Sequence, residues 1–281
     1  MDGVATAEPQ VRRDLFAETG GRMGVDARII EKDFWVCWAL RQLFSLPAHG
    51  RHFTFKGGTT LSKVFGVIRR FSEDVDIAVD WVPLGFVKDR DPSVPRSKTK
   101  QAHLLGEMLD ACREFIAGDL RRHLERRFRV VLKQDWTLDV DPDSPDSLRF
   151  FYPRALSLER SYVLDPVVLE LGTHAELVPS ADHDIVSYAA EQFPAAFNDA
   201  PVRVRAIDAE RTFWEKATIL HAEAHRPSEK PTPLRYSRHY YDTVMLAGSE
   251  YGERALRDRA LLERVVAHKR RVYPAAWARY D

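Results

Sequence analysis

The pattern of apolar and polar positions predicts an α+β first part and a helical last part. Apolar residues at helical spacing within residues 11–46 predict helix, most clearly in the run IIEKDFWVCWALRQLF. Short or alternating apolar runs predict strands at residues 53–55, 75–81, 128–132, 136–140, 148–152 and 163–171. We expect the last four to form an antiparallel extension of the sheet, because Asp, Pro and Ser turns separate them.

Further helices are predicted at residues 59–68, 100–122, 209–224 and 237–247. Residues 89–100 are rich in Pro, Ser and charge, which predicts a loop, and the prolines of residues 227–235 end a helix. Asp208 and Ser237 are predicted N-caps, and Gly248 a helix stop. We therefore expect two domains, residues 1–204 with the sheet and N-terminal helices and residues 205–281 with helices alone.

Composition places the chain among globular proteins. Its 281 residues are 44% hydrophobic and 30% charged, and no apolar run is long enough to span a membrane. The N-terminus has no apolar signal core. The two cysteines, Cys37 and Cys112, lie in predicted helices, so we expect reduced thiols and a cytoplasmic setting without a membrane partner.

Charge is balanced overall but uneven along the chain. Residues 254–281 carry eight Lys/Arg against three Asp/Glu, and residues 113–129 carry six against three. Basic patches of this kind bind an RNA backbone. A solvated helix face explains each patch taken alone equally well, so both interpretations stay open.

The most informative stretch is residues 53–80, which predicts strand, glycine turn, short helix and strand. Asp74 and Asp76 lie two residues apart among apolar neighbours, so both carboxylates point to the polar face of the second strand. Adjacent anions repel each other unless a cation lies between them. Mg²⁺ held by one or two carboxylates and by nucleotide phosphates is the usual arrangement.

The glycine pair before the short helix offers bare backbone amides to a phosphate. A turn that needs only a positive φ is the alternative, and the Walker spacing is absent. Hydroxyl and ammonium groups nearby favour phosphate binding. The residues predicted to bind the nucleotide are Lys56, Gly57, Gly58, Thr59, Lys63 and Ser72.

Three further side chains are candidates for the same site. Glu170 is the lone charge in an apolar strand, where an unpaired carboxylate would need a cation; a structural salt bridge is the alternative. Lys216 has its stem beside the apolar stripe of its helix, and Asp242, with Arg238 at i−4, also faces inward. The alternative is a Lys–Asp or Arg–Asp pair that only holds the two helices together. Such a pair does not exclude a role of the same residues in the site.

Two other metal patterns are weaker. Asp139, Asp141 and Asp143 alternate as in a calcium loop but lack its glycine and glutamate, which favours a plain turn. His221 and His225 have zinc spacing without a clear third ligand. No nucleophile elbow or dinucleotide fingerprint is present in the sequence.

Taken together, these segments resemble the AbiEii/AbiGii-type nucleotidyltransferase toxin family, which includes the MenT-like enzymes. The matching pieces span most of the chain: KGGTTLSK, RRFSEDVDIAV, the strand with Glu170, ERTFWEKATILH and SRHYYD. The resemblance implies a polymerase-β-like nucleotidyltransferase core with a mixed sheet. It also implies Mg²⁺ or Mn²⁺, an NTP substrate, an antitoxin partner within a toxin–antitoxin or phage-defence pair, and transfer of NMP to RNA, at the tRNA 3′ end.

The resemblance assigns roles to individual residues. Gly57 and Gly58 match the motif that holds the triphosphate. The metal ligands it implies are Asp74, Asp76 and, less closely matched, Glu170. The catalytic residues it implies are Asp74, Asp76, Lys216 and Asp242.

Other functions fit the same residues. A related core transfers a nucleotide to a small molecule or to a protein hydroxyl, and a binding module would hold a nucleotide without turnover. The basic tail favours RNA as the acceptor, and the complete set of carboxylates favours turnover.

Overall fold

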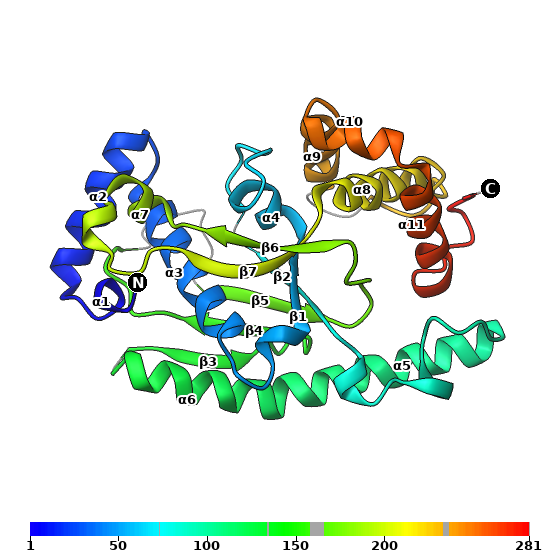
Figure 1. Ribbon diagram of the computed structural model, residues 1–281, viewed down its shortest axis with the longest axis horizontal. Helices are drawn as coiled ribbons and strands as arrows, with labels where there is room; N and C mark the ends of the chain where they lie inside the picture. Colours follow the sequence, from blue (N-terminus) through cyan, green and yellow to red (C-terminus); the bar gives the residue numbers. More distant parts are fainter. Residues whose placement is uncertain (73, 134, 158–165, 233–235, 281) are drawn as a thin grey trace.

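The computed structural model describes residues 1–281 except positions 73, 134, 158–165, 233–235 and 281. A seven-stranded mixed sheet lies at the centre, as Figure 1 shows. The long α5–α6 segment runs along one side of it, and the helices α8 to α11 gather at one end. This arrangement confirms the predicted α+β class with a mixed sheet and a helical C-terminal part.

The strand order is β3-β4-β5-β2-β1-β7-β6. The β2–β5 and β1–β7 pairs are parallel and the other four pairs are antiparallel. The β3–β4–β5 ladder confirms the expected antiparallel extension. The strands span β1 Phe53–Lys56, β2 Val75–Val79, β3 Thr137–Val140, β4 Ser147–Phe151, β5 Val167–Gly172, β6 Ser180–Ile185 and β7 Val202–Ile207.

Helices α8 and α9 have the bounds that the apolar periodicity predicts. Asp208 is the N-cap residue of α8, whereas α9 takes Tyr236 as its N-cap instead of Ser237. Gly248 ends α9 as expected. The α-helices are α1 Asp2–Ala5, α2 Pro9–Met23, α3 Ala27–Phe44, α4 Gly57–Lys63, α5 Lys98–Phe115, α6 Arg121–Val131, α7 Tyr188–Gln192, α8 Ala209–Ala224, α9 Ser237–Ala247, α10 Glu250–Arg257 and α11 Arg259–Val272.

The central core is an aromatic cluster between α3, α6 and the sheet. Trp38 of α3 packs against Phe128 and Phe150, with ring centroids 4.8 and 5.6 Å away, and all three side chains are fully buried. Asp26 is the N-cap residue of α3, and its side chain accepts a hydrogen bond from the Arg28 amide. Cys37 and Cys112 are free and buried.

The strand predicted at residues 128–132 is wrong. The helix that starts at Lys98 continues through a π-helical turn, Ile116–Leu120, into α6. Leu120, Leu124 and Phe128 are fully buried and four residues apart, which is helical spacing. The short apolar run at residues 128–132 predicts a strand, but the buried positions that lead into it follow the helical period.

Strands β6 and β7 were not predicted. In β7, VRVRAI alternates apolar residues with arginine and carries the strand signal, whereas the polar β6 carries none. The predicted domain boundary after residue 204 falls inside β7, which pairs with both β1 and β6. Residues 163–165 of the predicted strand 163–171 lie outside the described residues, and β5 begins at Val167.

No helix within the described part of the chain is long and apolar enough to cross a membrane.

The buried position of Phe128 gives a test of the fold. We expect Phe128→Ala to lower the free energy of unfolding by about 3–5 kcal/mol, because it leaves a cavity against Trp38 and Phe150. Val130, two residues along α6, is 83% exposed, and Val130→Ala should change stability by less than about 0.5 kcal/mol. Urea unfolding measures both, and equal losses would place Phe128 outside the core.

Candidate active site

The β1–α4 connection brings the backbone against two side chains. Gly57 has φ +84°, in the left-handed region that favours glycine, and a Cβ there would overlap the Asp76 carboxylate. A Cβ on Gly58 would lie 2.7 Å from Arg70 Nη2 and 2.9 Å from Ser72 Oγ. The glycines therefore serve two needs: a positive φ at Gly57, and close approach of the backbone to Asp76, Arg70 and Ser72.

Strand register gathers charged residues side by side. Lys56 of β1 pairs with Asp76 of β2, and Asp76 pairs with Glu170 of β5. Lys56 Nζ lies 3.7 Å from Asp76 Oδ1. Burial alone would lower the pKa of Lys56, but the carboxylates of Asp76, Glu215 and Glu170 raise it above its ordinary value.

Glu170 is the most perturbed carboxylate of this group. Partial desolvation, together with the nearby charges of Asp76 and Asp74, raises its pKa to about 7. The side chain nevertheless keeps contact with solvent, because it stands on the open face of β5. Within the described residues no cation forms an ion pair with Glu170, so the alternative of a structural salt bridge finds no support there.

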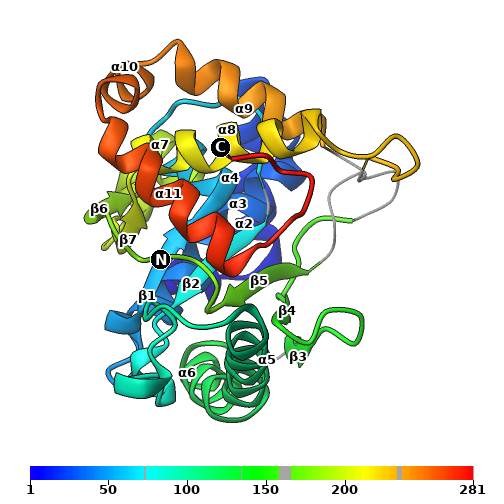
Figure 2. The ribbon, with the colours of Figure 1, turned by 90° about the vertical axis from the view of Figure 1, so that its right-hand side faces the viewer.

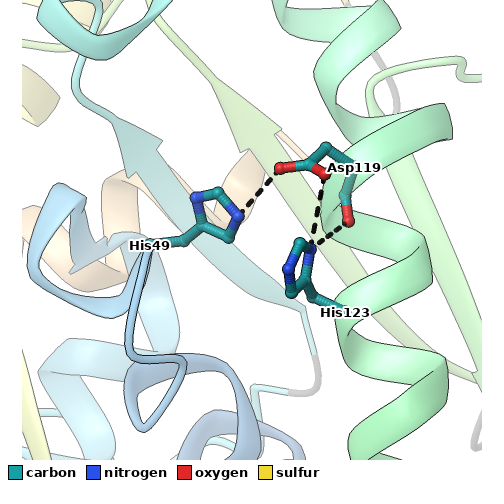
Figure 3. A group of neighbouring side chains, drawn as sticks. All are labelled: His49, Asp119 and His123. Atoms are coloured by element: carbon teal, nitrogen blue, oxygen red, sulfur yellow. Dashed lines mark hydrogen bonds and ion pairs between the residues drawn. The ribbon is translucent and has the colours of Figure 1, made fainter.

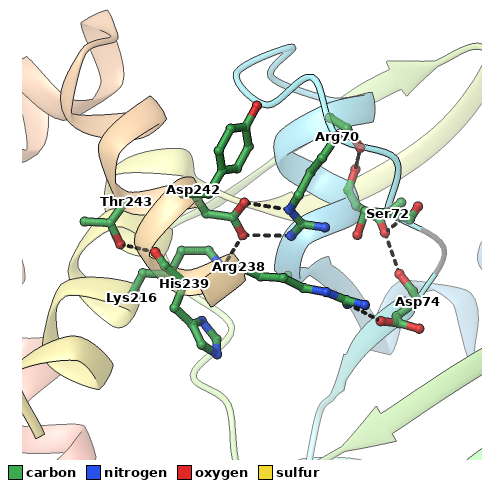
Figure 4. A network of polar contacts seen from close by, with 12 residues as sticks. Arg70, Ser72, Asp74, Lys216, Arg238, His239, Asp242 and Thr243 are labelled. Atoms are coloured by element: carbon green, nitrogen blue, oxygen red, sulfur yellow. Dashed lines mark hydrogen bonds and ion pairs between the residues drawn. The ribbon is translucent and has the colours of Figure 1, made fainter. Parts of the chain in front are cut away.

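Asp242 is fully buried and joins two cations from distant segments (Figure 4). Arg70, before β2, donates from Nε and Nη2 to its two oxygens at 2.9 Å each. Lys216 Nζ of α8 lies 2.8 Å from Asp242 Oδ2. Burial alone would raise the pKa of Asp242, but Arg70 and Lys216 hold it below its ordinary value.

Arg238 does not pair with Asp242, although it lies four residues before it. Its Nη1 instead donates to Asp74 Oδ2 at 3.3 Å, from α9 across to the start of β2. Helix α9 therefore places a carboxylate on Arg70 and a guanidinium on Asp74, as Figure 4 shows. The pairing of Arg70 with Asp242 and of Arg238 with Asp74 was not evident from the sequence, because both pairs join residues more than 160 positions apart.

Two predicted nucleotide-binding residues face elsewhere. Thr59 is buried, and its hydroxyl donates to the backbone oxygens of Ser72 and Asp74 at 3.3 and 2.5 Å. Lys63 Nζ lies 2.7 Å from Asp33 Oδ1 and 3.8 Å from the Tyr188 ring centroid. The ammonium group is therefore buried, on the side of α4 that faces the core. The prediction for Lys63 is corrected, because α4 turns its last residue away from the glycines.

A small cleft of about 170 Å³ lies over Asp76 and Glu170. Lys56, Asp76 and Glu170 line it, together with Tyr273 from beyond α11. The cleft therefore lies between the sheet and the C-terminal helical part.

A second cluster of potential metal ligands lies at the other end of β1 (Figure 3). His49 Nε2 lies 3.0 Å from Asp119 Oδ2, and His123 Nδ1 lies 3.5 Å from Asp119 Oδ1. His123 Nδ1 also lies 2.8 Å from the Asp119 backbone oxygen, one helical turn earlier. These contacts tie the segment before β1 to the π-helical turn and do not reach the acidic cluster.

The aspartates at 139, 141 and 143 and the histidine pair at 221 and 225, the two weaker metal patterns of the sequence, do not form metal sites in the described part of the chain. The Asp143 amide donates to Asp141 Oδ1 at 3.0 Å, which is a turn. The rings of His221 and His225 lie with centroids 4.6 Å apart and are tilted by 47°, and neither residue joins a group of three metal-ligating side chains in the described part of the chain.

Residues 38–279 match the family model described as nucleotidyl transferase AbiEii toxin, type IV TA system. The protein belongs to this family, and it is a nucleotidyltransferase toxin of the type IV toxin–antitoxin class.

Among solved structures, the nucleotidyltransferase toxin MenT4 from Mycobacterium tuberculosis H37Rv aligns with a TM-score of 0.42 and 14% identity. The alignment covers 91% of this chain and 98% of that one. A comparison with curated proteins gives no match. The family assignment follows from the match over residues 38–279 and not from the likeness to MenT4.

The Asp242 contacts predict a large stability effect. Asp242→Asn removes the buried anion and leaves Arg70 and Lys216 without their partner, so the free energy of unfolding should fall by about 3–5 kcal/mol. Asp74→Asn should change it by about 1 kcal/mol or less, because Asp74 makes a partly exposed pair.

Denaturant unfolding of both variants measures these effects. Equal losses would mean that Asp242 does not hold the two cations together.

Proposed function

We propose that this protein transfers NMP from an NTP to an RNA acceptor, at the tRNA 3′ end, with Mg²⁺ or Mn²⁺ as cofactor. The observation that carries the proposal is the pairing of Asp76 with Glu170 on adjacent strands, with Asp74 close enough to act on the charge of Glu170 and Gly57 against Asp76. An all-oxygen donor set suits Mg²⁺ and Mn²⁺.

The carboxylates fit a divalent cation on their own chemistry. Desolvation, and after it the charges of Asp76 and Asp74, disfavour ionisation of Glu170 and raise its pKa to about 7. A bound cation would reverse that effect, and the three side chains would hold it. When bound, the metal lowers the pKa of the acceptor hydroxyl and neutralises phosphate charge.

The chain's own residues bind and orient the NTP. We assign the triphosphate to the backbone amides of Gly57 and Gly58 and to Ser72, with Arg70 and Lys216 providing positive charge. Asp242 acts as a positioning residue, because it holds Arg70 and Lys216 in a fixed geometry.

Neighbouring residues hold this arrangement in place. Thr59 fixes the backbone at Ser72 and Asp74. Lys56 lies beside Asp76, on the side where the cleft opens. Lys63 has no part in this assignment.

The reaction is an in-line displacement. The 3′-hydroxyl oxygen of the acceptor bonds to the α-phosphorus as the bond from that phosphorus to the pyrophosphate oxygen breaks. The hydroxyl proton is released, and pyrophosphate leaves. Positioning and charge neutralisation supply most of the catalysis in such transfers.

RNA is the acceptor that the charge distribution favours. Residues 254–281 carry eight Lys/Arg against three Asp/Glu, and α11 of this segment borders the cavity beside the cleft. We place the reaction in the cytoplasm, beside a cognate antitoxin protein. We also propose a helical C-terminal domain that begins at Asp208, after β7, rather than at residue 205.

Removing either aspartate should abolish transfer. We expect Asp74→Ala and Asp76→Ala to lower the rate at least about 100-fold while the unfolding curve stays close to that of wild type. Asp80→Asn, further along the same polar stretch and paired with His52, is the matched control and should stay active. Radiolabel transfer measures the rate, and a fully active Asp76→Ala variant would rule out this site.

Metal binding can be measured without turnover. Titration with Mn²⁺, followed by electron paramagnetic resonance, should show sites that Glu170→Gln and Asp76→Asn weaken by about 10-fold or more, because each loses a ligand charge. Unchanged Mn²⁺ affinity in both variants would contradict the metal assignment.

The acceptor is tested with each of the four labelled NTPs on a tRNA pool, then on protein and on aminoglycoside. We expect label on the tRNA 3′ end, removable by a 3′ exonuclease. Label on protein or antibiotic alone would keep the transferase chemistry and overturn the RNA acceptor.

A further inference from the structure

Beyond the small cleft lies a larger cavity of about 510 Å³, between α8, α11 and the C-terminal segment. Figure 2 shows these elements side by side. The cavity shares Lys56, Ala175 and Tyr273 with the cleft over the carboxylates, so the two hollows adjoin. Four aromatic residues line the larger one: Tyr236, Tyr273, Trp277 and Tyr280.

The aromatic wall is anchored to α8. Tyr280 donates from its hydroxyl to the Thr218 backbone oxygen at 3.3 Å, and its ring stacks on His221 with centroids 5.7 Å apart. Tyr236 donates to the Ile219 backbone oxygen at 3.3 Å. Two of the four aromatic side chains are therefore held by α8, and the Trp277 ring has the Lys230 ammonium 4.1 Å from its centroid.

The unpaired charge at this cavity is positive. Its two carboxylates are already paired, Glu215 with Arg211 at 2.9 Å and Glu223 with Arg226 at 2.6 Å. Lys269 of α11 is half-buried, and within the described residues no carboxylate forms an ion pair with it. Burial lowers the pKa of Lys269, Glu215 partly offsets this effect, and the ammonium of Lys56 lowers the pKa further. An anion placed beside Lys269 would therefore be stabilised.

Asp76 separates this cavity from the glycine turn. One side of its carboxylate lies against Gly57, and Oδ1 on the other side lies 3.7 Å from Lys56 Nζ. In-line displacement brings the attacking hydroxyl in opposite the leaving pyrophosphate. With the triphosphate at the glycines, as proposed above, the acceptor enters from the Lys56 side, where the cavity lies.

We propose that this cavity binds the terminal unpaired nucleotide of a single-stranded RNA 3′ end. The base stacks against the aromatic wall, and Lys269 contacts the adjoining phosphate. Stacking on aromatic side chains is how proteins hold unpaired RNA ends, and it tolerates any base because every base has a π-face. The inference rests on the proposed transfer to RNA and adds the surface that receives it.

Three variants of the full chain test the site. Trp277→Ala removes part of the wall, Trp277→Phe keeps an aromatic ring, and Lys269→Gln removes the charge. Arg264→Gln, an exposed position on the same helix, is the control for loss of one positive charge. The probes are a labelled RNA hexanucleotide ending in a 3′-deoxynucleotide, and a non-hydrolysable analogue of the NTP that the wild type uses.

We expect Trp277→Ala to raise the Kd for the RNA, and the KM for RNA in turnover, about 10-fold, from the loss of one stacked base. The affinity for the NTP analogue should change less than about 2-fold, because the triphosphate is bound elsewhere. Trp277→Phe should recover most of the RNA affinity. Lys269→Gln should weaken RNA binding and its salt dependence, whereas Arg264→Gln should weaken it much less.

Two results would overturn the inference while leaving the transferase function intact. Weaker analogue binding with unchanged RNA binding would assign the cavity to the base of the NTP. Unchanged affinity for both probes in Trp277→Ala and Lys269→Gln would remove it from nucleic-acid binding altogether. Failure of the wild-type protein to label RNA would instead refute the acceptor itself, and that result is visible before any variant is made.

Discussion

One buried carboxylate connects the parts of this molecule that have to act together. Asp242, at the centre of α9, binds Arg70 from the sheet side and Lys216 from α8, and it has no exposure to solvent. Its burial is tolerated only because both cations compensate its charge. Arg238 of the same helix donates a hydrogen bond to Asp74. The helical part is therefore fixed to the sheet by charge at the point where the candidate site lies.

The acidic cluster is the opposite case, because its charges are not fully compensated within the protein. Strand pairing forces Asp76 and Glu170 side by side, and Lys56 offsets only part of their repulsion. Desolvation raises the pKa of Glu170, and the charges of Asp76 and Asp74 raise it further. A fold keeps such a cluster when a ligand supplies the missing positive charge, which is why these carboxylates, and not Asp242, are the ones we assign to metal.

Between these two groups, the glycine turn is set by space as well as by conformation. A side chain at Gly57 would collide with Asp76, and one at Gly58 would displace Arg70 and Ser72. The backbone therefore closes one side of the acidic cluster, while the cavity lined by aromatic residues opens on the other. This two-sided arrangement is what a displacement reaction needs, with one side for the leaving group and one for the attacking group.

The sequence by itself determined several local elements: the apolar strand that follows Asp74, and the bounds of helices α8 and α9. These depend on periodicity and on capping residues, which are properties of neighbouring positions. Only the tertiary structure decided that Phe128 belongs to a helix, that Lys63 turns to the core, and that Arg70 rather than Arg238 binds Asp242. Each of these depends on partners far apart in the chain, and packing and charge between distant segments leave no trace in local spacing.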